Sequence, residues 1–590
     1  MFSKSTYTFS VCFIVASLAV SGLAPGAGSD VRLGDPQFAL LADLSSGPKP
    51  TTLLRTNEVV YLEGDPIELR LDMDPNGHLF GKTFFLYLQN METGEIRYLN
   101  VEDGLLEAGT VTDLAGDTLA NIQPYGIPSL QDFVLLGSGG LAGPALEASG
   151  DLMGNHQLVL ELRDASGQRV FQRANSGFTV VESVETLPAE ITADTTLTSN
   201  NAYLLDNRAA FVRSGATLTI EPGTHILGTG TGALIIDRGA RIIADGTQAR
   251  PIVMTSAQSV GSRQTQDWGG LIINGNAPIN VPGGVAEGEG DTGEYGGNDP
   301  EDDSGIIRYL RVEFAGIEFS PENELNGIAF QGVGRGTVVD FIQVHFNKDD
   351  GVEFFGGTVN AKHVLLTSNA DDSLDWTDGW TGKMQFVVAQ QNKADADQGI
   401  EADNSAENNE LTPRSGPTIH NLTLIGGNAG QGTEEEGDIG ILLREGTAAE
   451  IRNAIVTGFG QEGLVIDQDA TVTQAQSGQI AVTNSIFAGN ATREPAKGAF
   501  GAGSNVTSGF DVSGFMTSST SNNRVGVNPM LRDAFNLLAP DYRPKLESPA
   551  ADVNFVSNPP DDGFFTPVNF VGGVSPLDDW TAGWTTHVPN

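Results

Sequence analysis

A cluster of carboxylates recurs three times along the chain, at intervals of 22 and 26 residues. Each copy places an Asp four residues before a second acid, and in the first two copies this Asp is followed directly by another Asp. Carboxylate oxygens at a regular spacing bind hard cations or transfer protons. The three copies are Asp349 with Glu353, Asp371 with Asp375, and Asp397 with Glu401.

Like charges in such a cluster repel, so something must compensate them. Unit charges about 5 Å apart repel by roughly 1 kcal/mol in water and by about 3 kcal/mol at an effective dielectric of about 20. One hypothesis is a Ca²⁺ site in which all six carboxylates are ligands. In a second, one carboxyl keeps its proton for acid-base catalysis, the candidates being Glu353, Asp375 and Glu401. In the third, nearby cations offset the charge, and these are Lys348, Lys383 and Lys393.

A second acidic segment lies in the Gly-rich stretch 287–305. A flexible backbone that carries many carboxylates can wrap a hard cation, although the spacing here differs from that of the EF-hand loop. A solvated loop is the alternative interpretation. The acids of the segment are Glu287, Glu289, Asp291, Glu294, Asp299, Glu301, Asp302 and Asp303.

The elements that must position the acids are short apolar segments, each beginning with a small residue. The steps between them are 22 to 26 residues, except for one step of 41 that contains the polar insertions 403–416 and 428–438. A period near 23 without helical patterning predicts a parallel β-helix, whose coils stack about 4.8 Å apart. The segments begin at Gly327, Gly351, Ser373, Gly399, Gly440 and Gly463.

The alternation of side chains along each strand predicts which way the acids point. Val352, Leu374 and Ile400 are apolar and should face the core of the coil. The residue that follows each of them is an acid and must then point outward, which predicts a three-rung acidic ladder on the outer face. Asn347 and Asn369 also fall at equivalent positions, which indicates an asparagine ladder at a corner of the coil.

The rest of the chain divides into regions by its texture. Residues 29–185 contain alternating strands and hairpin turns, which predict a small antiparallel, Ig-like β-sandwich. The parallel β-helix is expected over 186–545. The last segment, 546–590, is rich in aromatic residues and is expected to cap the open end of the coil. The fold class is therefore all-β.

The N-terminus and the overall charge indicate an exported protein. Residues 1–28 contain one Lys and an apolar run too short to span a bilayer, which predicts a secretory signal peptide. The only cysteine, Cys12, lies inside that run without the small-residue setting of a lipoprotein cysteine. The formal net charge of -43 disfavours nucleic acid and anionic membrane surfaces as partners. No later stretch could span a membrane.

Other chemistry is weakly signalled. The sequence has no H-E-x-x-H, no G-x-S-x-G and no P-loop, and without a mature cysteine it has no thiol chemistry. Trp380 could offer a stacking surface for a sugar ring and is a candidate substrate-binding residue. Trp376 has the parity of a core residue.

Several motifs resemble a family of secreted bacterial repeat proteins found in Bacteroidetes and Proteobacteria. They are "WGGLIINGNAPIN", "DDGVEFFGGTVNAKHV", "DDSLDWTDGWTGKMQF" and "GFFTPVNFVGGVSPLDDWTAGW". The resemblance covers roughly residues 190–590 and implies a right-handed parallel β-helix. Many members are lipoproteins, and this sequence departs from them there. The fold is more distantly similar to that of pectate-lyase-like enzymes, which act on acidic polysaccharides and use a basic residue near calcium. Lys383 is a candidate for that role.

Asp349-Asp350 and Asp371-Asp372 resemble the Asp-Asp pair of polygalacturonases. The accompanying Gly-His-Gly and Arg-Ile-Lys elements are absent, so the catalytic roles are not transferred. The leading hypothesis is a secreted, calcium-binding β-helix that binds extracellular glycans or cell surfaces. One alternative is a polysaccharide lyase or glycoside hydrolase that uses the acidic ladder, and the other is a purely structural envelope protein. The sequence predicts no oligomeric state.

Overall fold

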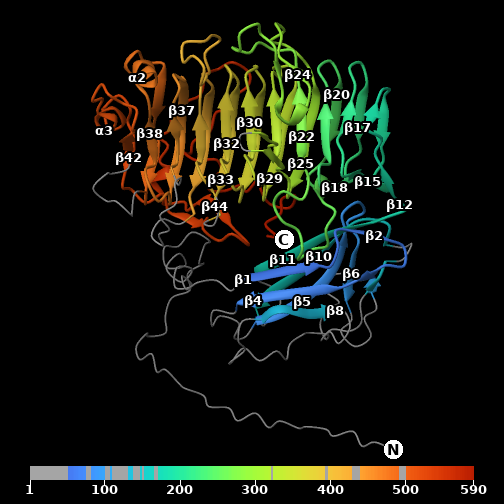
Figure 1. Cartoon of the computed structure of the whole chain (residues 1–590). Coiled ribbons are helices and arrows are strands. Elements are labelled where there is room, and N and C mark those ends of the chain that lie inside the picture. Colours follow the sequence, from blue (N-terminus) through green and yellow to red (C-terminus); the bar gives the residue numbers. More distant parts are fainter. Residues whose placement is uncertain are drawn as a thin grey trace, which may run out of the picture. The chain divides into compact units, whose positions relative to one another are not determined.

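The computed structural model describes residues 51–74, 82–99, 106–108, 130–136, 146–148, 152–164, 170–320, 323–392, 396–427, 439–490 and 500–589. These residues form antiparallel strands followed by a long parallel coil (Figure 1). The predicted fold class, a parallel β-helix preceded by small antiparallel sheets, is confirmed. The predicted leader 1–28 and Lys393 lie outside the described residues.

The strands before the coil pair antiparallel, except β2 and β11, which pair in parallel. β5 and β6 form the hairpin that the sequence predicts, and the Gly94 N–H donates to the Asn90 carbonyl at 2.9 Å. One sheet contains β1 (Thr51–Thr56), β4 (Leu69–Asp74) and β8 (Leu130–Leu136). The other contains β2 (Val60–Leu62), β11 (Val170–Val181), β10 (Gly154–Asp164), β5 (Lys82–Asn90), β6 (Ile96–Leu99) and β7 (Leu106–Ala108), and β3 (Pro66–Ile67) pairs separately with β9 (Leu146–Glu147).

Eleven short parallel strands form one face of the coil, which we call the ladder sheet. Each has two to five residues and pairs with the strands of the neighbouring coils. They are β13 (Glu190–Ile191), β16 (Ala210–Val212), β19 (Ala233–Ile236), β22 (Gly270–Asn274), β28 (Ile328–Gln331), β30 (Val352–Phe355), β32 (Leu374–Thr377), β34 (Ile400–Ala402), β36 (Leu442–Leu443), β38 (Leu464–Ile466) and β41 (Phe500–Ala502).

Sixteen strands form a second sheet, which bends around a corner and which we call the corner sheet. Its strands are β12 (Ser183–Thr186), β14 (Thr195–Leu197), β15 (Asn201–Asp206), β17 (Thr217–Ile220), β18 (His225–Thr229), β20 (Arg241–Asp245), β21 (Ile252–Ser256), β25 (Gly305–Glu313), β29 (Val338–His345), β31 (Asn360–Thr367), β33 (Lys383–Gln390), β35 (Thr418–Ile425), β37 (Ala449–Thr457), β39 (Ile480–Thr483), β40 (Ile486–Ala488) and β42 (Arg524–Val525).

The bend in the corner sheet is made by a single residue in each long strand. In β25, residues before Tyr309 pair with β20 and residues after it pair with β21, while Tyr309 itself has no partner in the register. Such residues have positive φ, an uncommon backbone conformation for a bulky side chain, which costs about 1 to 3 kcal/mol. The corner residues are Tyr309, Phe341, His363, Phe386, Asn421 and Asn453.

The interior of the coil is packed by the inward side chains of both sheets. The alternation predicted for the ladder strands is confirmed, because Val352, Leu374 and Ile400 are fully buried. Phe354 stacks on Phe330, with ring centroids 5.2 Å apart. The predicted asparagine position is also buried, and the Asn347 N–H donates to the Asn369 side-chain oxygen at 3.3 Å.

The corner residues form a continuous outer stripe. The first four stack as rings, with centroid separations of 4.4, 4.1 and 4.9 Å from Tyr309 through Phe386. The Asn421 and Asn453 side chains continue the stripe, and their amides donate to Phe570 and Ser557 carbonyls of the terminal segment. The stripe therefore provides an aromatic surface at one end and hydrogen-bonding groups at the other.

The terminal segment lies along this corner and not over the open end of the coil, where a cap was expected. Trp580 and Trp584 pack edge-on to Phe341, with centroid distances of 6.2 Å for both. Further along, the Gln343 side chain bonds the Thr586 backbone, and His345 contacts the Val588 carbonyl. The difference arises because the corner exposes rings and unpaired amides that the aromatic segment can cover.

The boundaries of the coil also differ from the expected 186–545. Parallel pairing begins with β12 at Ser183 and ends with β42 at Val525. The following residues form an antiparallel pair, β43 (Leu531–Asp533) with β44 (Asp541–Pro544), and η4 (Pro549–Ala551). These elements pack with the terminal segment on the corner sheet, since Ala534 and Tyr542 lie in one cluster with Leu365 and Val574.

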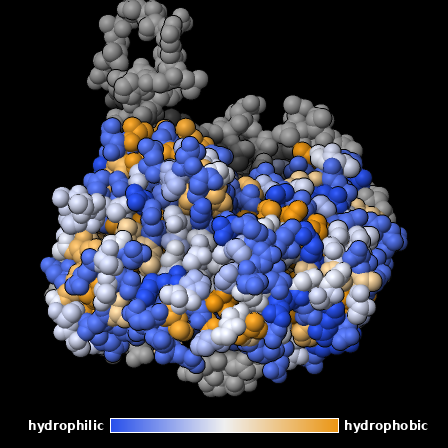
Figure 2. All heavy atoms as spheres, turned by 90° about the horizontal axis from the view of Figure 1, so that it is seen from above, coloured by the Kyte–Doolittle hydropathy of each residue, from blue (hydrophilic) through white to orange (hydrophobic). Residues whose placement is uncertain are grey.

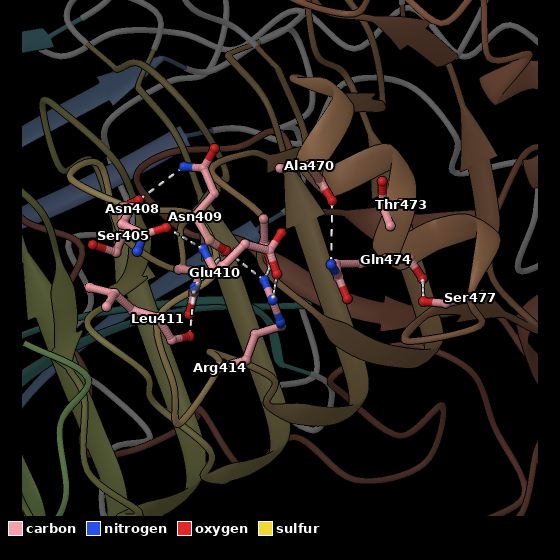
Figure 3. A network of polar contacts seen from close by, with 12 residues as sticks. Ser405, Asn408, Asn409, Glu410, Leu411, Arg414, Ala470, Thr473, Gln474 and Ser477 are labelled. Atoms are coloured by element: carbon pink, nitrogen blue, oxygen red, sulfur yellow. Dashed lines mark hydrogen bonds and ion pairs between the residues drawn. The ribbon is translucent and has the colours of Figure 1, made fainter.

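Two short helices, α2 (Asp469–Gln476) and α3 (Val512–Met516), lie near the last coils (Figure 1). The polar insertion at 403–416 is held by its own hydrogen bonds: Asn409 donates to the Ser405 carbonyl, and Arg414 bonds the Asn409 carbonyl and the Glu410 carboxylate (Figure 3). The surface seen in Figure 2 is mostly hydrophilic, with hydrophobic residues in small separate groups. Among the described residues, no helix has the length and apolarity that crossing a membrane requires.

We expect Trp584→Ala to lower the free energy of unfolding by about 3 to 5 kcal/mol, because the side chain is 1% exposed and fills the space beside the corner rings. The measurement is a urea denaturation curve. Leu577→Ala is the control in the same segment, because that side chain is 78% exposed and its loss should change stability by less than about 0.5 kcal/mol. Equal, small effects for both variants would show that the segment is not docked.

Candidate functional site: a carboxylate ladder on the coil

Three acids stand in register on neighbouring strands of the ladder sheet. Glu353 on β30 is paired with Asp375 on β32, and Asp375 is paired with Glu401 on β34. The ladder has a defined length, because the next position on one side is Ala329 and on the other is Leu442. The register that the repeat predicted is therefore present. The ladder is less exposed than expected, since Glu353 is only 8% exposed.

A second set of acids lies beside the ladder at the turn that enters each strand. Asp350 and Asp372 are buried, and each accepts a backbone hydrogen bond from the next coil. The Asp372 N–H donates to Asp350 at 3.0 Å, and the Gln398 N–H donates to Asp372 at 2.5 Å. These bonds fix the carboxylates at one level per coil and point them toward the ladder.

The two sets together form four overlapping groups of three carboxylates. In each group, one oxygen from every member lies within 4.8 Å of the others. Asp350, Asp371, Asp372 and Asp375 each belong to two groups, so the groups form a continuous array. The groups are Asp349/Asp350/Asp371, Asp350/Glu353/Asp375, Asp371/Asp372/Asp397 and Asp372/Asp375/Glu401.

Burial and mutual repulsion make it costly to ionise the whole array. Burial, followed by the charges of neighbouring carboxylates, raises the pKa of Asp350, Glu353 and Asp372 well above the usual range. Burial raises the pKa of Asp349 and of Glu401 to about 8 in each case. At neutral pH and without a cation, several of these carboxyls must therefore hold protons.

The acidic segment 287–305 meets the ladder at only one of its acids. Glu289, in η3 (Glu289–Asp291), is close enough for its charge to raise the pKa of Glu353. Tyr295 packs edge-on to Phe355, the outward neighbour of Glu353 on β30, and so the segment partly covers the ladder. Glu294, Glu301 and Asp303 instead pair with Arg238, Arg335 and Arg241.

One arginine neutralises the end of the ladder. Arg444 follows β36, forms an ion pair with Glu401, and bonds Asp403 through Nε at 2.8 and 3.0 Å. This is the charge compensation that the sequence assigned to lysines. Of those, Lys348 acts only on Asp371, whose pKa it lowers against the larger effect of burial.

The polar atoms around the first ladder group leave ligand positions open. The Asn326 amide donates to Glu353 Oε2 at 2.6 Å, while its own buried carbonyl oxygen has no hydrogen-bond partner. Asp375 Oδ1 is also buried without a partner. Buried acceptor oxygens without donors cost free energy, and a hard cation satisfies such oxygens. The donor set therefore fits Ca²⁺, with Asp350, Glu353 and Asp375 as the residues that would hold it.

Two residues expected to bind substrate lie elsewhere. Trp380 is fully buried in the core, stacked on Phe354 at 4.0 Å with Nε1 donating to the Val359 carbonyl, so it has no free face for a sugar. The prediction failed because Gly379 and Gly382 allow the chain to turn inward beside it. Lys383 lies on β33 of the corner sheet and pairs with Asp562, away from the ladder.

The residues that sequence reasoning missed are Asp350, Asp372, Asn326 and Arg444. The alignment that identified the ladder contained the signal for Arg444, because it places this residue beside Asp403, one position after each apolar segment. Asn326 carries no repeat signal. Its side chain reaches Glu353 only because the chain approaches β28 there.

Comparison with known proteins supports the fold. The family model described as a pectate-lyase like beta helix domain matches residues 189–529, more than half of the chain. Among solved structures, the catalytic unit of a thermostable GH87 alpha-1,3-glucanase from Streptomyces thermodiastaticus strain HF3-3 is similar at 10% identity, with a TM-score of 0.29. That similarity covers 74% of this chain and 89% of the other. Among curated proteins there is no significant match.

We expect the stability of the metal-free protein to fall as the pH rises from about 4 to about 8. The unfolded chain loses these protons near pH 4, whereas the native carboxyls keep them until the pH reaches their raised pKa, so rising pH favours unfolding. Each unit of pKa shift corresponds to about 1.4 kcal/mol.

The measurement is a series of denaturation curves in chelator, compared with the variant Glu353→Gln/Asp375→Gln/Glu401→Gln. This variant removes the three ladder charges, so its stability should depend less steeply on pH than that of the wild type. Parallel pH profiles for the two proteins would contradict the raised pKa values of the ladder.

Proposed function

The chain belongs to the pectate-lyase-like β-helix family, and we propose that it is a calcium-binding member that binds extracellular glycans or surfaces. The observation that carries the proposal is the group Asp350, Glu353 and Asp375, with its converging oxygens and the partnerless Asp375 Oδ1. Ca²⁺ takes six to eight oxygen ligands in flexible geometry. Three carboxylates supply part of this number, and water or a ligand supplies the rest.

Several features support a glycan as that ligand. Hydroxyl and carboxylate oxygens of a sugar can complete the coordination of a calcium ion held by the protein. The net charge of -43 disfavours direct binding of polyanions, so a bound cation would be the point of contact for an acidic chain. The proposed export rests on the leader 1–28, which lies outside the described residues.

The first test is metal binding by the full chain. After equilibration with calcium and removal of free ion, elemental analysis should find bound calcium, and the melting temperature should rise. A ligand at about 100 times its Kd adds roughly 2.7 kcal/mol of stability. The variant Asp350→Asn/Glu353→Gln/Asp375→Asn should bind less calcium and lose the temperature shift.

The matched control is Glu294→Gln/Glu301→Gln/Asp303→Asn. It removes the same formal charge from exposed acids that pair with arginines away from the ladder. It should retain both the bound calcium and the temperature shift. If the wild type binds no calcium, or if the two triple variants behave alike, the calcium proposal fails.

A second candidate function, polysaccharide cleavage, is favoured by the raised pKa of Glu353. A carboxyl that keeps its proton at neutral pH can act as a general acid, and Asp375 and Glu401 stand beside it to supply a base or metal ligands. The third reading, a purely structural envelope protein, requires neither binding nor turnover.

A panel of acidic and neutral polysaccharides separates these functions. Each is incubated with the protein, with calcium or with chelator, while reducing ends, unsaturated products and retention on the immobilised glycan are measured. The binding proposal predicts calcium-dependent retention without new ends. New ends that disappear in Glu353→Gln/Asp375→Gln/Glu401→Gln would establish cleavage instead. Lys383→Ala should change neither readout, since Lys383 pairs with Asp562 on the corner sheet.

A further inference from the structure

The carboxylate array is not symmetric along the coil. At the Glu401 end, Arg444 pairs with a ladder carboxylate, and among the residues that the structure describes it is the one cation that does so. The Arg444 N–H also donates to the Ala402 carbonyl at 2.9 Å, so the residue is fixed by the backbone at the level of this rung. The guanidinium is therefore a built part of the array.

At the other end, the contacts come from neutral groups. Glu353 accepts from the Asn326 amide, and Asp350 accepts from the Asp372 N–H. Within the described parts of the chain, no Lys or Arg forms an ion pair with Asp350, Glu353 or Asp375. The two groups that contain Asp375 thus have similar carboxylate geometry and different compensation.

We propose that Arg444 is a built-in cation that occupies the Glu401 end of the ladder and thereby confines the metal ion to Asp350, Glu353 and Asp375. The inference rests on the proposed calcium binding, and it identifies which of the overlapping groups takes the ion. It also explains why a three-rung ladder with four overlapping groups does not need a metal ion in each of them.

The physical reason is competition for the same oxygens. The guanidinium binds Glu401 through Nη2 and both Asp403 oxygens through Nε, and this fork geometry holds the charge in place. A divalent ion in the group Asp372/Asp375/Glu401 would share Glu401 with Arg444 and would be repelled by it. The first group shares only Asp375 with the second and is free of that repulsion.

The experiment counts bound calcium in full-length variants by elemental analysis and by calorimetric titration. Arg444→Met removes the charge and should bind one additional ion per chain, at the group that contains Glu401. Arg444→Lys keeps a positive charge there and should bind the same number as the wild type. Arg414→Met is the matched control, because Arg414 pairs with Glu410 in the insertion shown in Figure 3, and its count should not change.

Two further variants locate the additional ion and guard against misfolding. Arg444→Met/Glu401→Gln should return to the wild-type count, since it removes a ligand of the second group. Arg444→Met/Asp403→Asn removes the carboxylate that would be left unpaired, without removing any of the three acids in that group. It should fold if the single variant does not, and it should also bind the additional ion.

The outcomes separate this inference from the proposed function. If the wild type binds calcium and neither Arg444→Met nor Arg444→Met/Asp403→Asn binds more, the inference is wrong and the proposed function stands. If the wild type binds none and Arg444→Met binds one ion, the inference holds and the proposed function fails. An additional ion in Arg444→Lys would show that side-chain shape and not charge excludes the metal, which also overturns the inference.

Discussion

The in-register hydrogen bonding of parallel strands is the constraint on which the other features of this coil depend. Once Val352 pairs with Leu374 and Leu374 with Ile400, the neighbours of these residues have no choice of position. Acids that lie 22 and 26 residues apart in the sequence are brought to adjacent rungs, whatever their repulsion. The strands are stable because their inward side chains are buried, and the cost of the charges is met by the same burial.

The same constraint produces the corner stripe. Each long strand must turn between two faces, and a single residue with positive φ makes the turn at the same place in every coil. Side chains at those positions are stacked by the register, so rings come to lie on rings and amides beside amides. The array of acids and the stripe of rings are thus two results of one repeat, which lie on different sheets. One concentrates charge and the other concentrates apolar surface.

Much of this could be predicted from the sequence, because the repeat is a local pattern. The parallel coil, the ladder register and the inward positions of Val352, Leu374 and Ile400 all follow from the spacing of short apolar segments. Features that depend on irregular segments could not be predicted in the same way. Asn326 reaches Glu353 from outside the repeat, and Trp380 turns into the core through a local bend. Lys383 was placed by its nearness in sequence to the acids, although the chain changes sheets between Asp375 and Lys383.

The path of the terminal segment has a consequence for how the coil is assembled. Its contacts run backwards, from Asn484 near Phe555, through Asn453 near Ser557, to Gln343 near Thr586. In a solenoid, each coil otherwise touches only its neighbours, so coils can fray one at a time from an end. Here the last residues to be synthesised fasten coils that were made much earlier. The unit of cooperativity is therefore a run of coils, and it is completed only when the end of the chain has arrived.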